Sequence, residues 1–534
     1  MGGDNGPSKL MTMAGVAGAA MVYNKISNYK TKVARQERCK VQGVKVAILG
    51  AGMSGMCLAI KLQEAGIPFE IFEKADGFGG TWLHNQYPDC GCDVPSHLYS
   101  YSFEPRPNWS RKWAKREEIL AYFEEVAAKY GLSQHTHFKA TIEGAYFNND
   151  TKRWKIKVKY ADGAVRENDF TFFVPATGQL GVPKFPNVPG REDFKGDSWH
   201  SAQWRHDVNL KGKKVIGIGT GATAIQAFPI IAQEAEHLTV LQRSPIWCIK
   251  KEDFEYSDLT KAIFRYVPFA RQAYRGSLFM LNEALYTVIE SRKGNGLLYT
   301  ICKDAFSQQM MEMQENRYPK EQIVPEYAIG CKRVALAENW MPMLARSNVD
   351  LVADKTLKRI TATGVEYTDG TKEDADAIIY ATGFYSSNFM SQIDIVNGDG
   401  LSLQDYWKDI PRAYKSVSVP NFPNLFFLYG PGSNLGHSSI IFMVETQVEY
   451  VVRMMSYMVD TGATSLEVKE DLYEEDNVRL QKELQETTFA DPSCTSWYKR
   501  ADGTIVNNWA GNCMKFWYHL SGLDKDAYNL GSRL

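Results

Sequence analysis

Short, continuous apolar runs recur along the chain and predict the buried strands of an α/β fold. The clearest are residues 45–49 (KVAIL), 69–73 (FEIFE), 214–218 (KVIGI) and 238–242 (LTVLQ). Runs of this length without polar alternation are typical of parallel strands that are covered on both faces. In both halves of the chain a glycine-rich turn and a helical stretch separate the first run from the second. The pattern therefore predicts two β-α-β units of the Rossmann type.

Longer stretches carry apolar residues at helical spacing. One helix is expected within residues 111–131, and another begins after residue 436, where His437 is expected to cap it. Residues 253–324 hold amphipathic helical runs without any nucleotide-binding pattern. Because charged side chains interrupt these runs, we expect core packing or a substrate-pocket wall rather than a membrane contact. The apolar positions are Ile263, Val267, Phe279, Leu281, Leu285 and Ile289, and the charged ones are Arg265, Arg271, Arg275 and Glu283.

The first unit carries the glycine pattern G-x-G-x-x-G directly after its strand. Gly50 permits a tight turn, Gly52 lets a pyrophosphate approach the backbone, and Gly55 allows close packing of helix against strand. Glu73 ends the second strand about 20 residues later, where a carboxylate can accept hydrogen bonds from the ribose of an adenosine. Strand, glycines, helix, strand and acid in this order predict a dinucleotide site. A second glycine pair at residues 79–80 favours FAD.

The second unit has the variant G-x-G-x-x-A at residues 219–224. It contains Gly219, Thr220, Gly221 and Thr223, and ends in alanine at 224. Arg243 stands at the end of its second strand, where the first unit has Glu73. A guanidinium can pair with the 2′-phosphate of NADPH, whereas a carboxylate would repel it. We therefore expect NADPH rather than NADH at this unit.

The order of these patterns predicts an α/β protein with two Rossmann-like dinucleotide-binding domains, for FAD and NADP, and a helical insertion in the second. Two A-T-G turns, at 176–178 and 381–383, resemble the crossing points between the domains of such flavoproteins. The expected boundaries are an N-terminal arm at 1–42, the FAD-binding domain at 43–183 and 377–534, the NADP-binding domain at 184–250 and 325–376, and the insertion at 251–324.

Composition adds few constraints. The 61 Lys and Arg residues nearly balance the 62 Asp and Glu residues, so charge does not favour a nucleic-acid partner. The nine cysteines include no C-x-x-C pair and no zinc-ligand spacing, which predicts free thiols, no metal site and a reducing, cytoplasmic location. The apolar tract at 10–23 is shorter than the ~20 residues that cross a bilayer, and a packing arm is expected there. A weak membrane-surface helix is the alternative.

A third motif lies between the two units, in residues 194–204 (FKGDSWHSAQW). Phe194, Gly196, His200 and Trp204 fill the pattern F-x-G-x-x-x-H-x-x-x-W, which resembles the identifying motif of single-component, class B flavoprotein Baeyer–Villiger monooxygenases. Arg205 follows where that family usually has proline or aspartate. The resemblance covers residues 45–509 and is closest to the aryl-ketone and fungal members.

Residues 79–93 resemble a second motif of the family, G-G-x-W-x-x-x-x-[FY]-P-[GM]-x-x-x-D. Asp89 departs from it, because glycine or methionine is usual there. The resemblance implies that Asp93 pairs with a catalytic arginine, and that Arg333 in the segment GCKR is that arginine. A permanently charged guanidinium can stabilise an anionic peroxide without giving up a proton. His200 would couple cofactor binding to domain closure.

The resemblance also extends the cofactor sites. It adds Lys332 as a second contact to the phosphate and Trp497 as a contact to the nicotinamide cofactor. The residues expected at FAD are Gly50, Gly52, Gly55, Glu73, Gly80, Thr81, Trp82 and Tyr87, and those expected at NADPH are Gly219, Thr220, Gly221, Thr223, Arg243, Lys332 and Trp497.

The activity that the resemblance implies is an NADPH- and O2-dependent oxidation of a small-molecule ketone to an ester or lactone, through a C4a-peroxyflavin and a tetrahedral adduct. A flavin monooxygenase that oxygenates amines or sulfides is the first alternative, which Trp204 and the arginine of the K-R pair disfavour. The missing C-x-x-C pair disfavours a disulfide reductase. A non-catalytic dinucleotide-binding sensor is the third alternative. The identity of the ketone and the oligomeric state do not follow from the sequence.

Overall fold

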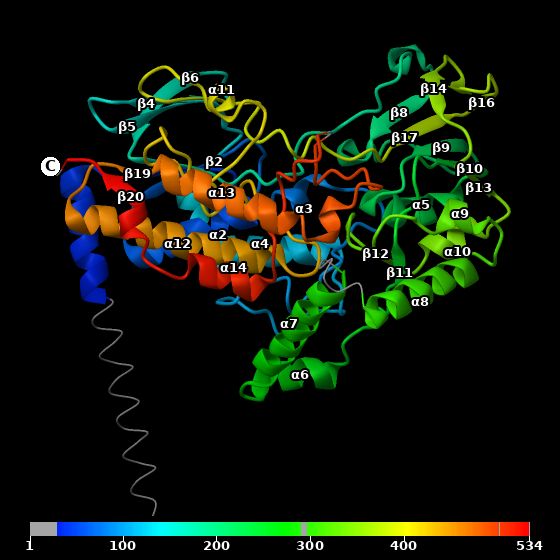
Figure 1. Cartoon of the computed structure of the whole chain (residues 1–534), viewed down its shortest axis with the longest axis horizontal. Helices are drawn as coiled ribbons and strands as arrows, with labels where there is room; N and C mark the ends of the chain where they lie inside the picture. The colour runs from blue at the N-terminus through cyan, green and yellow to red at the C-terminus, as the bar shows by residue number, and fades with distance from the viewer. Residues whose placement is uncertain (1–28, 290–295, 501, 533–534) are drawn as a thin grey trace, which may run out of the picture.

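The computed structural model describes residues 29–289, 296–500 and 502–532. Its first unit, on the left in Figure 1, is built on a parallel sheet with strand order β3-β2-β1-β7. Its apolar strands are fully buried at β1 and β7, as expected for a sheet covered on both faces. The strands are β1 (Val46–Leu49), β2 (Phe69–Glu73), β3 (Thr136–Phe138) and β7 (Phe172–Pro175).

Helices of the first unit come from distant parts of the chain. Helix α2 (Met53–Ala65) follows the first glycine turn and packs along α12 (Ile440–Thr461), whose apolar face is buried. Ser439 rather than His437 caps α12, since its hydroxyl accepts a hydrogen bond from the backbone N–H of Ile441, so that expectation was wrong. The remaining helices of this unit are α3 (Thr81–His84), α4 (Arg116–Lys129), α11 (Leu403–Trp407), α13 (Glu470–Leu484) and α14 (Cys513–Leu520).

The second unit, on the right in Figure 1, has a parallel sheet with strand order β13-β10-β9-β17-β8. Helix α5 (Ala222–Glu234) begins at the second glycine turn, and α10 (Trp340–Leu344) packs against it. The second unit therefore repeats the architecture of the first. The strands are β8 (Asp197–His200), β9 (Lys214–Ile218), β10 (His237–Leu241), β13 (Val349–Val352) and β17 (Ala377–Tyr380).

Smaller sheets flank the two units. One has the order β18-β4-β5-β6 and lies at the top of the first unit, and a three-stranded one, β14-β15-β16, lies at the top of the second. A two-stranded sheet of β19 and β20 lies near the C-terminus. The bounds are β4 (Thr141–Asn148), β5 (Arg153–Lys159), β6 (Val165–Phe170), β18 (Asp394–Val396), β14 (Leu357–Ile360), β15 (Gly364–Tyr367), β16 (Lys372–Asp374), β19 (Leu466–Val468) and β20 (Tyr528–Leu530).

The insertion leaves the second unit after β11 (Cys248–Lys250) and returns before β12 (Ala335–Ala337), which pairs with β11. It consists of α6 (Asp258–Tyr266), α7 (Ala270–Ile289), α8 (Leu297–Met313) and α9 (Lys320–Ile323). Core packing was wrong for most of its apolar residues: Ile263, Val267, Leu281 and Leu285 are exposed, and Phe279 alone of those expected and described packs against the core. The alternative role as a substrate-pocket wall stays a prediction.

The predicted arm falls largely outside the described residues, including the apolar tract at 10–23. A helix over residues 29–42 is described, and Arg35 anchors it through an ion pair to Asp460 at the end of α12. Among the helices of the described residues, none has both the length and the apolar character needed to span a bilayer.

Candidate active site

An arginine from the second unit meets an aspartate from the first. The Arg333 guanidinium donates hydrogen bonds from Nε and Nη2 to the two Asp93 carboxylate oxygens, at 2.5 and 2.6 Å. Both side chains are about one quarter exposed, so the pair is partly open to solvent rather than enclosed in the core. The structure thus brings together the two residues that the family resemblance assigned to catalysis.

Charge keeps both members of this pair ionised. Burial acts to raise the pKa of Asp93, but the charge and hydrogen bonds of Arg333, with Lys251 beyond them, outweigh it and leave that pKa below its usual value. Burial likewise acts to lower the pKa of Arg333, and Asp93 overrides it and raises that pKa. The site therefore holds a permanent cation whose orientation is fixed by a bidentate partner.

The first glycine turn has the shape that a dinucleotide requires. Gly50 has a φ of +105°, and a side chain at Gly55 would place its Cβ 1.9 Å from the Gly50 carbonyl oxygen. Gly80 also has a positive φ, of +53°, and comes so close that a Cβ on it would lie 3.0 Å from the Cα of Gly52. The two glycine loops thus approach each other with bare backbone, which fits FAD.

Glu73 lies at the predicted strand end and is buried. Its two carboxylate oxygens accept hydrogen bonds from the backbone N–H groups of Ala51 and Ala75, both at 2.8 Å. These two bonds hold the carboxylate in place. Each oxygen keeps a second lone pair, which can accept a hydrogen bond from a ribose hydroxyl.

The segment after the glycine pair connects the two units. The Tyr87 hydroxyl donates to the Gln226 side chain on α5 at 3.1 Å, and Gln226 also exchanges hydrogen bonds with the backbone of Gly91. Asp89 has a φ of +60°, the left-handed region that glycine would adopt without strain, and its carboxylate pairs with Lys115. The departure from the family motif therefore preserves the turn. Thr81 and Trp82 begin α3, and the Trp82 indole N–H donates to Tyr99.

The second glycine turn fits a dinucleotide as well. Gly219 has a φ of +111°, and a Cβ there would lie 2.4 Å from the Ala381 carbonyl oxygen. Gly221 starts α5 and faces open space, since a Cβ on it would meet no atom within 4 Å. Thr220 donates from its hydroxyl to the Ser244 carbonyl, and Thr223 lies in the first turn of α5. An N-terminal helix turn with no side chain in front of it is suited to a phosphate.

Two cations converge beside this turn. The Lys332 ammonium donates to the Ser244 hydroxyl at 2.8 Å, and Arg243 is exposed next to Ser244 in the chain. Burial, with the nearby Arg243 charge second, lowers the pKa of Lys332 to about 8. A dianionic phosphate would relieve this repulsion, so the pair fits the 2′-phosphate of NADPH.

The residues of the third motif stabilise the junction between the units. His200 accepts a hydrogen bond at Nδ1 from the backbone N–H of Ala202, so its Nε2–H donates to the Gly383 carbonyl, at 3.0 Å. Burial lowers its pKa, which favours this neutral form. Gly196 has no room for a side chain, because a Cβ would lie 2.5 Å from the Asp376 carbonyl oxygen.

The other members of this motif contact protein rather than solvent. Phe194 is buried in a cluster with residues of β9 and β17, and Trp204 lies edge-on to Trp199. Arg205 forms ion pairs with Asp197 and Asp207, so the residue that departs from the family pattern is held in the turn. These contacts fasten the motif to the sheet of the second unit.

A disulfide corrects the prediction of free thiols throughout. Cys331 and Cys494 are bonded, whereas the other seven cysteines are free. The bond ties the segment of Lys332 and Arg333 to the loop that carries Trp497. That tryptophan is 37% exposed and its ring lies tilted against Tyr498, with the centroids 4.4 Å apart, so it is available to a cofactor.

A buried polar cluster joins the insertion to the first unit. The Glu283 carboxylate of α7 accepts hydrogen bonds from the backbone N–H groups of Cys513 and Met514 at the start of α14, and lies 3.5 Å from His437. The ligand atoms of Glu283, His437 and Cys513 lie within 4.8 Å of one another, a grouping that the sequence, which predicted no metal site, did not reveal. Their mutual contacts fasten α7 to α12 and α14.

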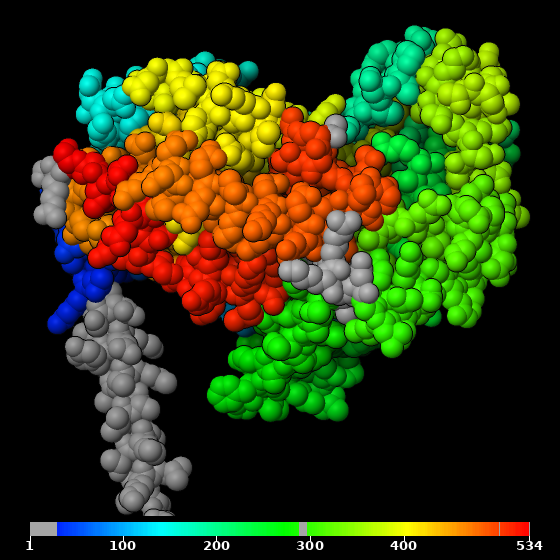
Figure 2. Space-filling view, viewed as in Figure 1, coloured from blue at the N-terminus to red at the C-terminus, as the bar shows by residue number. Residues whose placement is uncertain are grey.

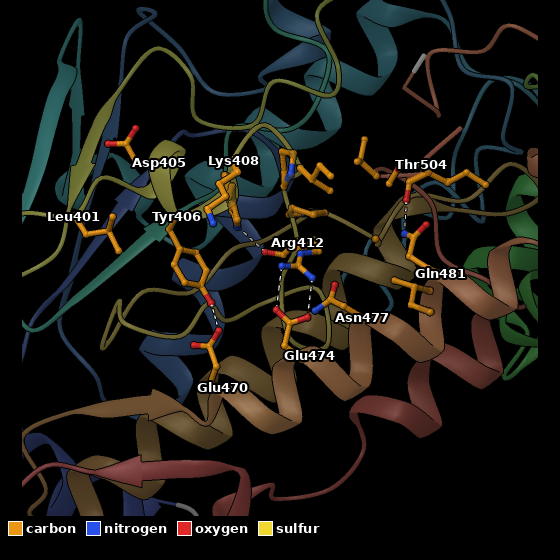
Figure 3. Close-up of a pocket in the computed structure, with 18 residues that line it drawn as sticks. Leu401, Asp405, Tyr406, Lys408, Arg412, Glu470, Glu474, Asn477, Gln481 and Thr504 are labelled. Atoms are coloured by element: carbon orange, nitrogen blue, oxygen red, sulfur yellow. Dashed lines mark hydrogen bonds and ion pairs between the residues drawn. The ribbon is translucent and has the colours of Figure 1, made fainter. Parts of the chain in front are cut away.

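A separate pocket of 610 Å³ lies between α11 and α13 (Figure 3). Part of its charged lining is paired: Arg412 donates to both oxygens of Glu474, at 2.8 and 3.0 Å, and Tyr406 donates to Glu470 at 2.8 Å. Neither Asp93 nor Arg333 lines it. This pocket is therefore distinct from the candidate active site.

Comparison with known proteins identifies the family. Residues 43–272 match the model of the flavin-binding monooxygenase-like family. The chain is 38% identical to the FAD-binding monooxygenase ktnD of Aspergillus niger, over 92% of this chain and 82% of that protein. It is 36% identical to a Baeyer–Villiger monooxygenase of Pseudomonas aeruginosa, over 91% of each chain. The chain belongs to the Baeyer–Villiger monooxygenase family. The resemblance inferred from the motifs is thereby confirmed.

Solved structures of this family share the fold. An oxidised steroid monooxygenase bound to NADP superposes with a TM-score of 0.79 at 27% identity, covering 91% of this chain and 99% of that one. A closed cyclohexanone monooxygenase gives a TM-score of 0.81 at 25% identity, covering 92% and 99%. The predicted α/β class with two dinucleotide-binding units is confirmed, whereas the domain boundaries and the roles of individual residues stay predictions.

Two contributors to the site could not be found from the motifs. Lys251 is buried, donates to the Cys92 carbonyl at 3.3 Å, and adds positive charge beside Asp93. Gln226 bridges the two units through Tyr87 and Gly91. Neither residue belongs to a recognisable pattern, and each acquires its role from contacts far along the chain.

Proposed function

We propose that the chain is an FAD-containing, NADPH- and O2-dependent monooxygenase that inserts one oxygen atom beside a ketone carbonyl and yields an ester or lactone. The observation that carries this proposal is the bidentate Arg333–Asp93 pair, positioned where the two dinucleotide units meet. Relatives named Baeyer–Villiger monooxygenase support the reaction class. Ketone and dioxygen are then the small-molecule partners.

The two glycine turns would hold the cofactors. FAD would lie on Gly50, Gly52 and Gly55, with Glu73 at its ribose, and NADPH would lie on the turn that starts at Gly219, with Lys332 and Arg243 at its 2′-phosphate. Bound FAD supplies the redox chemistry by which NADPH and dioxygen are consumed and one oxygen atom is transferred.

The chain's own contribution is electrostatic. Arg333 presents a cation that cannot act as an acid, so it stabilises negative charge on oxygen without donating its proton. Asp93 restricts the rotation of this guanidinium, and Arg333 itself, with Lys251 as a weaker second cation, keeps the pKa of the Asp93 carboxylate low. Gln226 joins α5 of the second unit to Gly91 of the first, and His200 holds the turn at Gly383 where the chain leaves the second unit.

Incubation of the purified holoenzyme with NADPH, oxygen and a panel of linear, aryl and cyclic ketones plus a thioether tests the proposal, with products identified by mass. Esters or lactones are expected. Sulfoxide as the sole oxygenated product would favour the sulfide-oxygenating alternative. Tight nucleotide binding without NADPH consumption on any substrate would favour a dinucleotide-binding sensor. The cytoplasmic location is a prediction that fractionation of the source cells would check.

A further inference from the structure

The insertion carries an unusual share of the apolar surface. Nearly half of the large apolar side chains exposed in the described residues lie between residues 259 and 301, which is less than a tenth of the chain. Exposed apolar side chains concentrated in one segment in this way indicate a site of interaction with a protein, a ligand or a membrane. The exposed side chains are Leu259, Ile263, Tyr266, Val267, Phe269, Met280, Leu281, Leu285, Leu297, Leu298 and Ile301.

Helix α6 is fixed on one side and apolar on the other. Phe264 packs inward, with its ring 5.1 Å from that of Tyr274 on α7. Leu259, Ile263 and Tyr266 recur at spacings of four and three, so they share the opposite face, and they are 71, 38 and 75% exposed. The contact of Phe264 with α7 therefore holds α6 so that its apolar face points outward.

The turn from α6 to α7 forms an apolar tip. Residues 267–269 (VPF) connect the helices, and Tyr266 at the end of α6 and Phe269 are 75 and 78% exposed. Figure 2 shows this helix pair as a green projection from the lower side of the molecule. The projection is convex, so it inserts into a soft partner more readily than it pairs with a flat protein surface.

Cations dominate the sequence around the tip. From residue 259 to residue 282 it contains four cations and no carboxylate, and the exposed Asp258 at the start of α6 lies 3.9 Å from Lys261. Arg275 is directed inward, where it donates to the His97 carbonyl, whereas Arg265 is exposed on α6 beside the tip. The next carboxylate, Glu283, is buried against α14. Cations beside exposed aromatic and aliphatic residues match an anionic lipid headgroup layer over acyl chains.

We propose that the α6–α7 tip, with the adjoining apolar faces of α7 and α8, docks the enzyme on an anionic bilayer surface. Tyr266, Val267 and Phe269 enter the boundary between headgroups and acyl chains, and Lys261 and Arg265 contact the headgroups. Helix α7 contacts both α6 and α8, so the three helices are neighbours. The docking is interfacial, and it is independent of the reaction that the enzyme catalyses.

Flotation of the full-length holoenzyme with vesicles tests this proposal. Vesicles of phosphatidylcholine with phosphatidylserine are expected to carry the enzyme upward in the gradient, and added salt is expected to weaken the binding. The double variant Tyr266→Glu/Phe269→Glu should lose at least about tenfold in partition coefficient, since two carboxylates replace the inserted rings. Lys261→Gln/Arg265→Gln should lower binding and flatten its salt dependence.

The matched control is Val165→Glu, because Val165 is 48% exposed on β6, at the opposite edge of the molecule from α6 (Figure 1). This control should bind vesicles like the parent enzyme, and all variants should retain flavin and lipid-free turnover. Unchanged binding of the tip variant would overturn the proposal. So would an enzyme that ignores vesicles but changes from dimer to monomer on the tip substitution, because the surface would then join two copies.

Discussion

Arg333 and Asp93 stand 240 residues apart in the chain and share two hydrogen bonds of 2.5 and 2.6 Å. Arg333 lies two residues after the buried Cys331 in the second unit, and Asp93 directly follows the buried Cys92 in a loop of the first. The pair therefore exists only when the two units are joined as the structure shows. This dependence makes it sensitive to any change at the junction.

Substitution of Arg333 should abolish oxygen transfer. Arg333→Ala is expected to lower product formation at least about a hundredfold, and Arg333→Lys almost as much, because an ammonium cannot reproduce the bidentate contact. Product quantification by mass, with flavin content as a folding check, measures the effect. Arg205→Lys is the control, since Arg205 pairs with Asp207 at the surface. Near-normal turnover of Arg333→Ala would remove this residue from the mechanism.

Glycine substitutions should separate folding from cofactor binding. Gly221→Ala meets no atom within 4 Å, so the protein should fold and retain flavin, while the added methyl obstructs the pyrophosphate and raises the KM for NADPH at least about tenfold. Gly55→Ala collides with the Gly50 carbonyl and should yield little flavin-loaded protein. Steady-state kinetics and the flavin absorbance distinguish the two. An unaltered KM in Gly221→Ala would place the nucleotide elsewhere.

Binding of NADP should weaken as pH rises through the titration of Lys332. With a pKa of about 8, its ammonium is charged at pH 7 and mostly neutral at pH 9, so the Kd should increase by about tenfold across this range. Loss of the proton removes the positive charge of Lys332, so NADP binds more weakly at high pH. Lys332→Gln should bind weakly and with little pH dependence. Parallel pH profiles for the two proteins, measured by fluorescence titration, would contradict the assignment.

Loss of the disulfide should loosen the loop that carries Trp497. Cys331→Ser is expected to lower the free energy of unfolding by about 2–4 kcal/mol, because the bond closes a long loop in the unfolded chain. Thiol titration of the denatured protein should count seven thiols before reduction and nine after it. Cys302→Ser, at a free and partly exposed cysteine, serves as the control. Nine thiols without reductant would show that the bond is absent in solution.

The sequence by itself determined the class of the fold and the places of the cofactor turns. Continuous apolar runs predict buried strands from local sequence alone. Glycines such as Gly50 and Gly219 are also local requirements, because the positive φ at those positions disfavours any side chain. The arginine at 243 predicts a phosphate contact in the same local way, since charge complementarity depends on one residue type at one strand end.

Only the tertiary structure decided which distant residues meet and which faces stay open. The pairing of Cys331 with Cys494 and the contact of Lys251 with the Asp93 segment depend on loop placement that no local pattern encodes. Apolar spacing in α6 and α7 is the same for a buried helix and for a surface helix. Burial is a property of what surrounds a helix, and for this reason the sequence predicted a core where the structure has an exposed apolar surface.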